Sequence, residues 1–248
     1  MTSARDLYVD LLIRTVVDAI YGDPMPGPWR VGNKFDRGGS PGRLGPSTAH
    51  TMVGVDRLNN LRDLAQTALD AGIPGDFIET GVWRGGCCIL MRGILASNGE
   101  AERKVYVADS FQGVPPPKPE LYPADRDDTL YRHPELVVPL DVVKANFARY
   151  GLLDDRVVFV EGFFTDTLPS LDCGPLALLR LDGDLYESTW LALQYLYPKL
   201  SPGGFVIIDD FGVSPACRQA VFDYRTRLEI KAPIQEVDRS GVWWRKPL

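Results

Sequence analysis

The sequence has little positive charge and no long apolar run. Its 27 Lys and Arg residues are outnumbered by 33 Asp and Glu residues, so the net charge is −6 and no basic field is available to hold a phosphate backbone. No stretch is apolar over the length needed to cross a bilayer, and the N-terminus has no signal-peptide pattern. We therefore expect a cytoplasmic protein that has neither nucleic acid nor a membrane as its partner.

Cysteine and histidine are also scarce, with four and two residues respectively. The spacing of the cysteines matches neither a zinc site nor a disulfide framework, and Cys87 and Cys88 are interpreted as small buried apolar residues. His50 lies in a predicted loop, where a local hydrogen bond to the backbone is the favoured interpretation. A role for His50 as a base or as a hydrogen-bond donor to a substrate stays open as the alternative. His133 is expected to be solvated.

Short apolar runs alternate with helical patterns over most of the chain. With 248 residues and 45% hydrophobic composition, the chain is long enough for one large α/β domain, and we expect a single domain over 1–248. Apolar strands that alternate with helices are typical of a mostly parallel sheet with helices on both faces. The predicted strands are DFIETG, KVYVADS, RVVFVEG, LALLRLDGD and GGFVIIDD, the predicted helices between and after them are 86–98, 139–149, 186–199 and 214–228, and the tail (IQEVD, GVWWRK) is predicted to pair as a hairpin.

Two segments stand outside this alternation. Residues 1–72 are expected to form an N-terminal cap, with a long Gly- and Pro-rich loop over 22–46 and a helix over about 55–71. A first amphipathic helix is indicated by apolar residues at helical spacing, namely Tyr8, Leu12, Val16, Ala19 and Ile20. Residues 113–138 carry six prolines and are predicted to be an insertion on the substrate side.

Acidic residues and glycines follow the predicted strands, where ligands bind in such sheets. The acids are Glu79, Asp109, Glu161, Asp182, Asp209 and Asp210. The glycines of 81–86 let the backbone turn sharply and approach a ligand, and their spacing differs from the G-x-G-x-x-G of dinucleotide enzymes. We expect Asp109 to accept the hydroxyls of a ribose, and Gly162 and Phe163 to provide a wall for an adenine. A plain tight turn and ordinary core packing are the structural alternatives for these residues.

Three of the acids are predicted to hold a metal ion. Asp182 ends the fourth strand and Asp209 and Asp210 end the fifth, so neighbouring strand ends can bring their carboxylates together. Such a cluster would repel itself without a cation, and oxygen ligands without His or Cys suit Mg²⁺. The ion would lower the pKa of a substrate hydroxyl and orient its oxygen. The structural alternative is that these aspartates cap helices or end strands.

Taken together, these residues resemble the macrocin O-methyltransferase family, which includes sugar methyltransferases of macrolide and aminocoumarin antibiotic pathways. The resemblance covers almost the whole chain from residue 49 and is carried by AHTM (49–52), RLNNLR (57–62), PGDFIETGVWRGG (74–86), VADSFQG (107–113), NFARYGLLDD (146–155), LRLDGDLYEST (179–189) and LSPGGFVIIDD (200–210). It implies a Rossmann-like class I methyltransferase fold, S-adenosylmethionine as methyl donor, Mg²⁺ at the three aspartates, and a homodimer or higher homo-oligomer. The implied acceptor is a sugar hydroxyl of a glycosylated natural product such as an antibiotic.

The resemblance also implies roles for particular residues. Asp184 would be the base, acting beside Asp182 at the reacting hydroxyl. The expected cofactor-binding residues are Glu79, Thr80, Gly81, Trp83, Arg84, Gly85, Asp109, Ser110, Gly162, Phe163, Thr51 and Met52. A competing interpretation makes Asp184 the N-cap of the next helix, because Glu187 lies three residues on, at the spacing of a capping box.

A more distant likeness to catechol O-methyltransferases breaks down at two positions. Leu185 stands where those enzymes carry a lysine, and Asp210 where they carry an asparagine, which argues against catechol chemistry. A nicotinamide-dependent oxidoreductase is disfavoured by the glycine spacing, and a nucleoside-binding regulatory module without catalysis by the intact acids. The sequence does not name the sugar, its hydroxyl or the aglycone, because the segments 22–46 and 113–138, expected to line the acceptor pocket, have no readable pattern.

Overall fold

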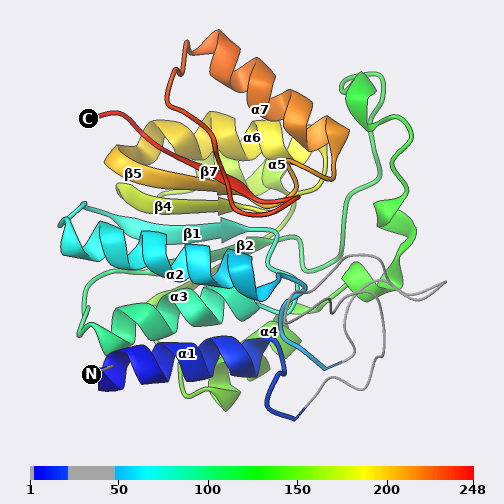
Figure 1. Cartoon of the computed structure of the whole chain (residues 1–248). Coiled ribbons are helices and arrows are strands. Elements are labelled where there is room, and N and C mark those ends of the chain that lie inside the picture. The colour runs from blue at the N-terminus through cyan, green and yellow to red at the C-terminus, as the bar shows by residue number, and fades with distance from the viewer. Residues whose placement is uncertain (1–2, 22–47) are drawn as a thin grey trace.

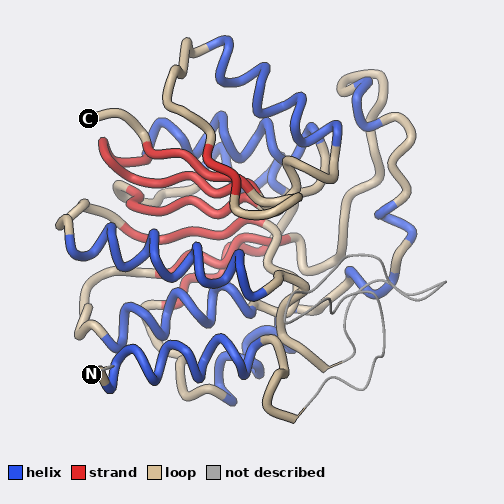
Figure 2. Tube along the Cα trace, in the orientation of Figure 1, coloured by secondary structure: helices blue, strands red, loops and turns tan. Residues whose placement is uncertain are grey.

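Seven strands form one sheet in the computed structural model, which describes residues 3–21 and 48–248 (Figures 1 and 2). The predicted loop over 22–46 lies outside the described residues. The strand order is β3-β2-β1-β4-β5-β7-β6. The strands are β1 (Asp76–Thr80), β2 (Val105–Asp109), β3 (Val157–Glu161), β4 (Leu176–Leu181), β5 (Leu200–Ile208), β6 (Gln235–Glu236) and β7 (Val242–Arg245).

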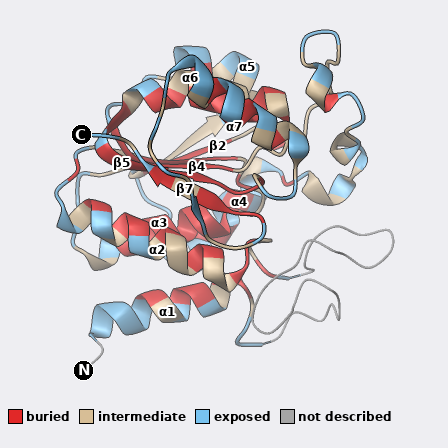
Figure 3. Ribbon diagram, turned by 45° about the horizontal axis from the view of Figure 1, so that its top comes forward, coloured by how far each residue is buried: buried red, intermediate tan, exposed pale blue. Residues whose placement is uncertain are grey.

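The pairing of the strands follows the predicted pattern. The five apolar runs are β1 to β5, and the four pairings among them are all parallel. β7 runs antiparallel to both β5 and β6, so the predicted C-terminal hairpin is present. β4 is buried along its whole length, as expected for a strand with strands on both sides and helices on both faces (Figure 3). The predicted α/β fold with a mostly parallel sheet is confirmed.

Each face of the sheet is covered by its own helices (Figure 1). Because alternate strand residues point to opposite faces, Phe77 and Ile207 join the core beneath α1, α2 and α3, whereas Ile78 and Ile208 join the core beneath α6 and α7. The helices are α1 (Ala4–Val16), α2 (Val55–Asp70), α3 (Gly86–Ser97), α4 (Leu140–Arg149), α5 (Phe164–Thr167), α6 (Tyr186–Leu196) and α7 (Pro215–Arg227).

The predicted helices are confirmed with small shifts of their ends, except for the first. Helix α1 stops at Val16, and the apolar residue Ile20 is 45% exposed beyond it. Asp18 takes a left-handed φ of 53°, a conformation that helices commonly adopt just past their last turn. The apolar pattern therefore extended the predicted helix past its real end.

The cysteines agree with the expectation from the sequence. All four cysteines are free and buried, and Cys87 and Cys88 are 2% and 0% exposed on α3, which confirms their interpretation as core residues. In the part of the chain that the structure describes, no helix is long and apolar enough to cross a membrane.

The insertion, residues 113–138, contains neither a strand nor an α-helix. It follows β2 and passes beyond the carboxyl ends of the strands, on the side where the predicted acids lie (Figure 1). Its regular structure consists of three short 3-10 turns, η1 (Pro123–Asp125), η2 (Leu130–Arg132) and η3 (Pro134–Leu136). The insertion can therefore form one wall of a site at this edge of the sheet.

Candidate active site

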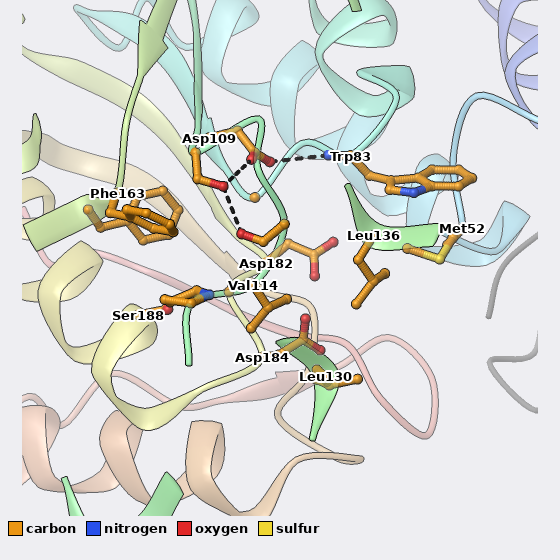
Figure 4. Close-up of a pocket in the computed structure, with 16 residues that line it drawn as sticks. Met52, Trp83, Asp109, Val114, Leu130, Leu136, Phe163, Asp182, Asp184 and Ser188 are labelled. Carbon is orange, nitrogen blue, oxygen red and sulfur yellow. Dashed lines mark hydrogen bonds between the residues drawn. The ribbon is translucent and has the colours of Figure 1, made fainter. Parts of the chain in front are cut away.

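A pocket opens at the carboxyl ends of β1, β2 and β4, where the strand order changes direction (Figure 4). Such a switch point is the usual ligand site of an open α/β sheet. The insertion contributes an apolar wall to it. The lining residues are Met52, Gly81, Trp83, Asp109, Ser110, Gly113, Val114, Pro115, Leu130, Leu136, Phe163, Phe164, Asp182, Gly183, Asp184 and Ser188.

The glycine turn between β1 and α3 forms one edge of this pocket. Gly81 has a φ of 80°, and a side chain there would collide with the backbone carbonyl of Asp182 at the end of β4. Trp83, two residues on, also has a left-handed φ of 49°. Close packing of the ends of β1 and β4 therefore requires glycine at this position, whereas the sequence suggested close approach to a ligand as the reason.

Asp109 holds the glycine turn in place. One carboxylate oxygen accepts hydrogen bonds from the backbone N–H groups of Val82 (2.7 Å) and Trp83 (3.4 Å). The other accepts from the N–H of Phe111 at 2.8 Å. Burial raises the pKa of Asp109, while these backbone donors oppose that rise. The carboxylate thus joins the ends of β1 and β2 at the pocket.

Trp83 connects the glycine turn with the insertion. Its indole Nε1 donates to the carbonyl of Glu135 at 2.8 Å. The guanidinium of Arg84 lies 4.2 Å from the centroid of the Trp83 ring, and Arg84 donates to the carbonyl of Ala49 at 2.9 Å. Trp83 and Met52 therefore line the pocket, whereas the Arg84 guanidinium is directed to the segment that precedes α2.

Several residues predicted to bind the cofactor do not line the pocket. Glu79 is 2% exposed, pairs with Arg180 of β4 and accepts a hydrogen bond from the Cys88 thiol at 2.8 Å. Burial raises the pKa of Glu79 to about 7, although Arg180 opposes this rise. Because side chains alternate along β1, Glu79 points toward α3 rather than toward the pocket. The other residues in this group are Thr80, Thr51, Arg84, Gly85 and Gly162.

These other residues are buried in the fold or make contacts within the backbone. Thr80 is 1% exposed within β1. Thr51 is buried and accepts a hydrogen bond from the N–H of Val53 at 3.0 Å. Gly85 has a φ of 85° and is the N-cap of α3, and the N–H of Gly162 donates to the carbonyl of Asp109 at 2.9 Å.

Three carboxylates come together at the end of the pocket. Asp182, Asp184 and Asp210 each offer an oxygen atom, and these oxygens lie within 4.8 Å of one another. In addition, Asp210 accepts a hydrogen bond from the N–H of Asp184 at 3.1 Å. We call these three residues the carboxylate group. Its hard oxygen donors at this spacing fit a divalent cation such as Mg²⁺.

Asp209 is not part of the carboxylate group, contrary to the predicted metal site. It is 0% exposed and its two oxygens pair with Arg57 of α2 and Arg180 of β4. Asp209 and Asp210 directly follow the last residue of β5, and their side chains diverge there: Asp209 contacts the two arginines, whereas Asp210 accepts from the N–H of Asp184. Arg180 also donates to Asp182 at 3.0 Å, so Asp209 supports the carboxylate group through this arginine.

Asp184 is not the N-cap of α6, which was the competing interpretation. The N-cap is Leu185, and the first two N–H groups of α6, those of Tyr186 and Glu187, donate to the carboxylate of Asp125. Asp184 itself has a left-handed φ of 57°. The sequence offered no signal for Asp125, because it lies 61 residues from its partner in a segment without periodicity.

His50 does not line the pocket, and its side chain has a partner that the sequence did not suggest. Its Nδ1 lies 2.8 Å from the hydroxyl of Tyr150, the C-cap of α4. Burial lowers the pKa of His50, and the nearby Arg149 and Arg84 lower it further. The structure therefore gives no support to His50 as the base.

The fold and the pocket together define a class of protein. A mostly parallel sheet of this order, with a glycine turn after β1, an acid at the end of β2 and a carboxylate group after β4 and β5, fits a Rossmann-like methyltransferase. The chain belongs to the macrocin-O-methyltransferase (TylF) family, whose model matches residues 29–246. It is an S-adenosylmethionine-dependent O-methyltransferase, and the family predicted from the sequence is confirmed.

Three relatives illustrate this membership. The chain is 52% identical to the 8-demethyl-8-(2,3-dimethoxy-alpha-L-rhamnosyl)-tetracenomycin-C 4'-O-methyltransferase of Streptomyces olivaceus, over 98% of this chain and 93% of that protein. It is 48% identical to the mycinamicin III 3''-O-methyltransferase of Micromonospora griseorubida, over 97% of this chain and 96% of that protein. It is similar to the solved structure of the O-methyltransferase NovP, with a TM-score of 0.89, 44% identity, and coverage of 98% of this chain and 100% of that chain.

Proposed function

We propose that this enzyme transfers a methyl group from S-adenosylmethionine to a sugar hydroxyl of a glycosylated natural product such as an antibiotic, with the help of Mg²⁺. The observation that carries the proposal is the carboxylate group, whose oxygens lie within 4.8 Å of one another beside a pocket bounded by the glycine turn. The named activities of the tetracenomycin and mycinamicin relatives support a sugar as the acceptor.

The donor would bind between the glycine turn and the start of α5. Trp83 lies on one side of the pocket and Phe163 on the other, with Asp109 at the end of β2 (Figure 4), and Gly81 also lines the pocket. The Phe163 ring offers an apolar surface for an adenine. One oxygen of Asp109 already accepts from both Val82 and Trp83, so the other oxygen, which accepts from the N–H of Phe111, is the one that can also accept a ribose hydroxyl.

Asp182 and Asp210 would hold Mg²⁺, and Asp184 would take the proton. When bound, the ion would lower the pKa of the sugar hydroxyl and orient its oxygen. In the transfer, the hydroxyl oxygen would form a bond to the methyl carbon while the carbon–sulfur bond of the donor breaks, and the electron pair of that bond would stay on sulfur. The hydroxyl proton passes to the carboxylate of Asp184. The chain's main contributions are alignment and deprotonation, because the sulfonium is already an activated donor.

The acceptor class can be tested directly with a panel of O-demethylated deoxysugar glycosides and methyl-labelled S-adenosylmethionine. We expect label on a sugar hydroxyl of at least one glycoside, located by mass spectrometry of the released sugar. Free catechols and simple phenols serve as the contrasting acceptors. Label on these, and on no glycoside of the panel, would overturn the sugar assignment.

Removal of divalent metal is expected to stop turnover. Without a cation the carboxylate group cannot lower the pKa of the acceptor, so treatment with EDTA should abolish methylation and added Mg²⁺ should restore it. Binding of S-adenosylhomocysteine, measured by calorimetry, should persist in the metal-free enzyme, because the donor residues come from other strand ends. Full activity after thorough removal of metal would exclude this part of the proposal.

The substitution Asp109→Ala is expected to weaken donor binding by about ten- to a hundredfold. The loss of a charged hydrogen-bond acceptor corresponds to about 1.5–3 kcal/mol. The measurement is the Kd of S-adenosylhomocysteine by calorimetry. Glu102→Ala is the control, because Glu102 is exposed and precedes β2 at its opposite end. Parent-like affinity in Asp109→Ala would show that Asp109 does not contact the donor.

A further inference from the structure

The insertion is anchored to the first turn of α6 by a buried carboxylate. Asp125 is 1% exposed, and its two oxygens accept hydrogen bonds from the N–H groups of Tyr186 (2.6 Å) and Glu187 (3.0 Å). Side chains normally cap a helix from the residue just before it, whereas Asp125 does so from another segment. The N–H groups at the start of α6, which have no partner within the helix, therefore donate to the insertion rather than to solvent.

Other contacts hold the same part of the insertion on α6. Lys118 donates to the buried carboxylate of Glu187 at 2.9 Å. The ring of Tyr122 lies 6.0 Å from that of Tyr186, which in turn stacks on Trp190 with an interplanar angle of 10°. Residues 118–125 therefore form an anchor on α6, in which Asp125 is the fully buried member.

A second anchor lies near the other end of the insertion. The indole Nε1 of Trp83 donates to the carbonyl of Glu135 at 2.8 Å, which joins the insertion to the glycine turn. Leu130 lies between the two anchors and Leu136 directly follows the second, and both line the pocket. The apolar acceptor wall is thus held from both sides, by α6 and by the turn after β1.

The α6 anchor also lies close to the carboxylate group in the chain. Helix α6 begins two residues after Asp184, and its N-cap Leu185 is 1% exposed and cannot shift freely. The hydroxyl of Ser214 donates to the carbonyl of Asp184 at 2.7 Å, which fixes the other side of this short link. Any change in the position of the first turn of α6 is therefore transmitted to Asp184.

We propose that Asp125 is a positioning residue for methyl transfer. By accepting hydrogen bonds from the first turn of α6, it fixes the position of the acceptor wall relative to the carboxylate group. This inference rests on the proposed function, since it assigns the acceptor to the pocket wall. Asp125 touches neither the acceptor nor the donor. Its loss should therefore affect the acceptor and leave the donor site intact.

The test compares Asp125→Ala and Asp125→Asn with the parent enzyme. We expect Asp125→Ala to raise the KM of the best glycoside of the panel by at least about tenfold, with the Kd of S-adenosylhomocysteine within about twofold of the parent's. Asn has one acceptor oxygen in place of two and should give an intermediate KM. In hydrogen exchange, the amides of Tyr186 and Glu187 and the peptide 126–138 should all lose protection together.

Two controls separate positioning from a general loss of stability. Asp127→Asn makes the same change at an exposed neighbour in the insertion and should leave KM unchanged. Asp154→Ala removes the pair with Arg92 before β3, at the opposite edge of the sheet, and should lower the melting temperature without raising the acceptor KM. An Asp125→Ala variant that behaves like Asp154→Ala would overturn the proposal.

The remaining outcomes are also decisive. If Asp125→Ala does not fold, the same criteria apply to Asp125→Asn, and an unchanged KM in that variant contradicts the proposal. If the parent methylates no glycoside, the proposed function fails. Hydrogen exchange still tests whether Asp125 couples the first turn of α6 to residues 126–138. Loss of protection at the start of α6 with full protection of 126–138 would then show that Asp125 caps the helix without positioning the wall.

Discussion

Replacing Asp184 by asparagine is expected to lower kcat by about 10²–10⁴-fold while the free energy of unfolding stays within about 0.5 kcal/mol of the parent's. The amide keeps the size of the side chain but cannot take the proton of the acceptor. Asp184 has a left-handed φ of 57°, and Asn is among the residues that adopt this conformation most readily, so the backbone should be unaffected. The first N–H groups of α6 donate to Asp125 and not to Asp184, so the helix keeps its N-terminal bonds.

Single-turnover kinetics, chemical denaturation and calorimetric titration with Mg²⁺ check this expectation. Glu229→Gln is the matched control, because it converts an acid into an amide at another left-handed residue, with a φ of 50°, at the end of α7. Turnover that recovers at saturating Mg²⁺ would make Asp184 a metal ligand rather than the base. Near-parent turnover at ordinary Mg²⁺ concentration would remove Asp184 from the chemistry.

Replacing Asp209 by alanine is expected to destabilise the fold by about 3–5 kcal/mol, which is the usual cost of removing one partner of a buried ion pair. Asp209 is 0% exposed and pairs with both Arg57 and Arg180, whose side chains are 6% and 2% exposed. Its loss removes a buried acceptor from both guanidiniums between α2 and the sheet, while Asp238 still pairs with Arg57, and Glu79 and Asp182 still pair with Arg180. We therefore expect a large loss of stability at every Mg²⁺ concentration.

Urea denaturation of the metal-free enzyme measures this effect without a contribution from Mg²⁺. Asp63→Ala is the control, because Asp63 forms an exposed pair with Arg62 on the same helix as Arg57 and should change stability by less than about 1 kcal/mol. If Asp209→Ala is as stable as the parent and loses only Mg²⁺ affinity, then Asp209 is a metal ligand, as the sequence suggested.

Much of the architecture follows from patterns local in the sequence. Five apolar runs of strand length, each followed by an acid or a glycine, predicted β1 to β5 and the edge of the sheet that carries the site. Their apolar character is itself a consequence of burial on both faces, so it can be read without knowledge of the partners. The glycine turn after β1 and the acid that ends β2 could be found in the same way, because each lies at the end of such an apolar run.

The assignments that differ depend on where side chains point. Asp209 and Asp210 are neighbours in the sequence, yet one pairs with Arg57 and Arg180 and the other faces Asp182 and Asp184. Glu79 was predicted to bind the cofactor, but its position in the alternation of side chains along β1 directs it toward α3 and Arg180. The face of the sheet to which Glu79 points could have been predicted from the alternation of side chains along the strand. The arginine with which each acid pairs could not be predicted in this way.

The sequence by itself determined the class of fold, the family and the edge of the sheet at which the pocket and the carboxylate group lie, because apolar runs and strand-end acids are local features. The tertiary structure alone decided which carboxylates meet, since this depends on the register of β4 against β5 and on the arginines between the layers. It also decided that Asp125 caps α6, a contact between residues 61 positions apart. No local pattern can encode such a contact, because only the folded chain brings the insertion back onto the helix.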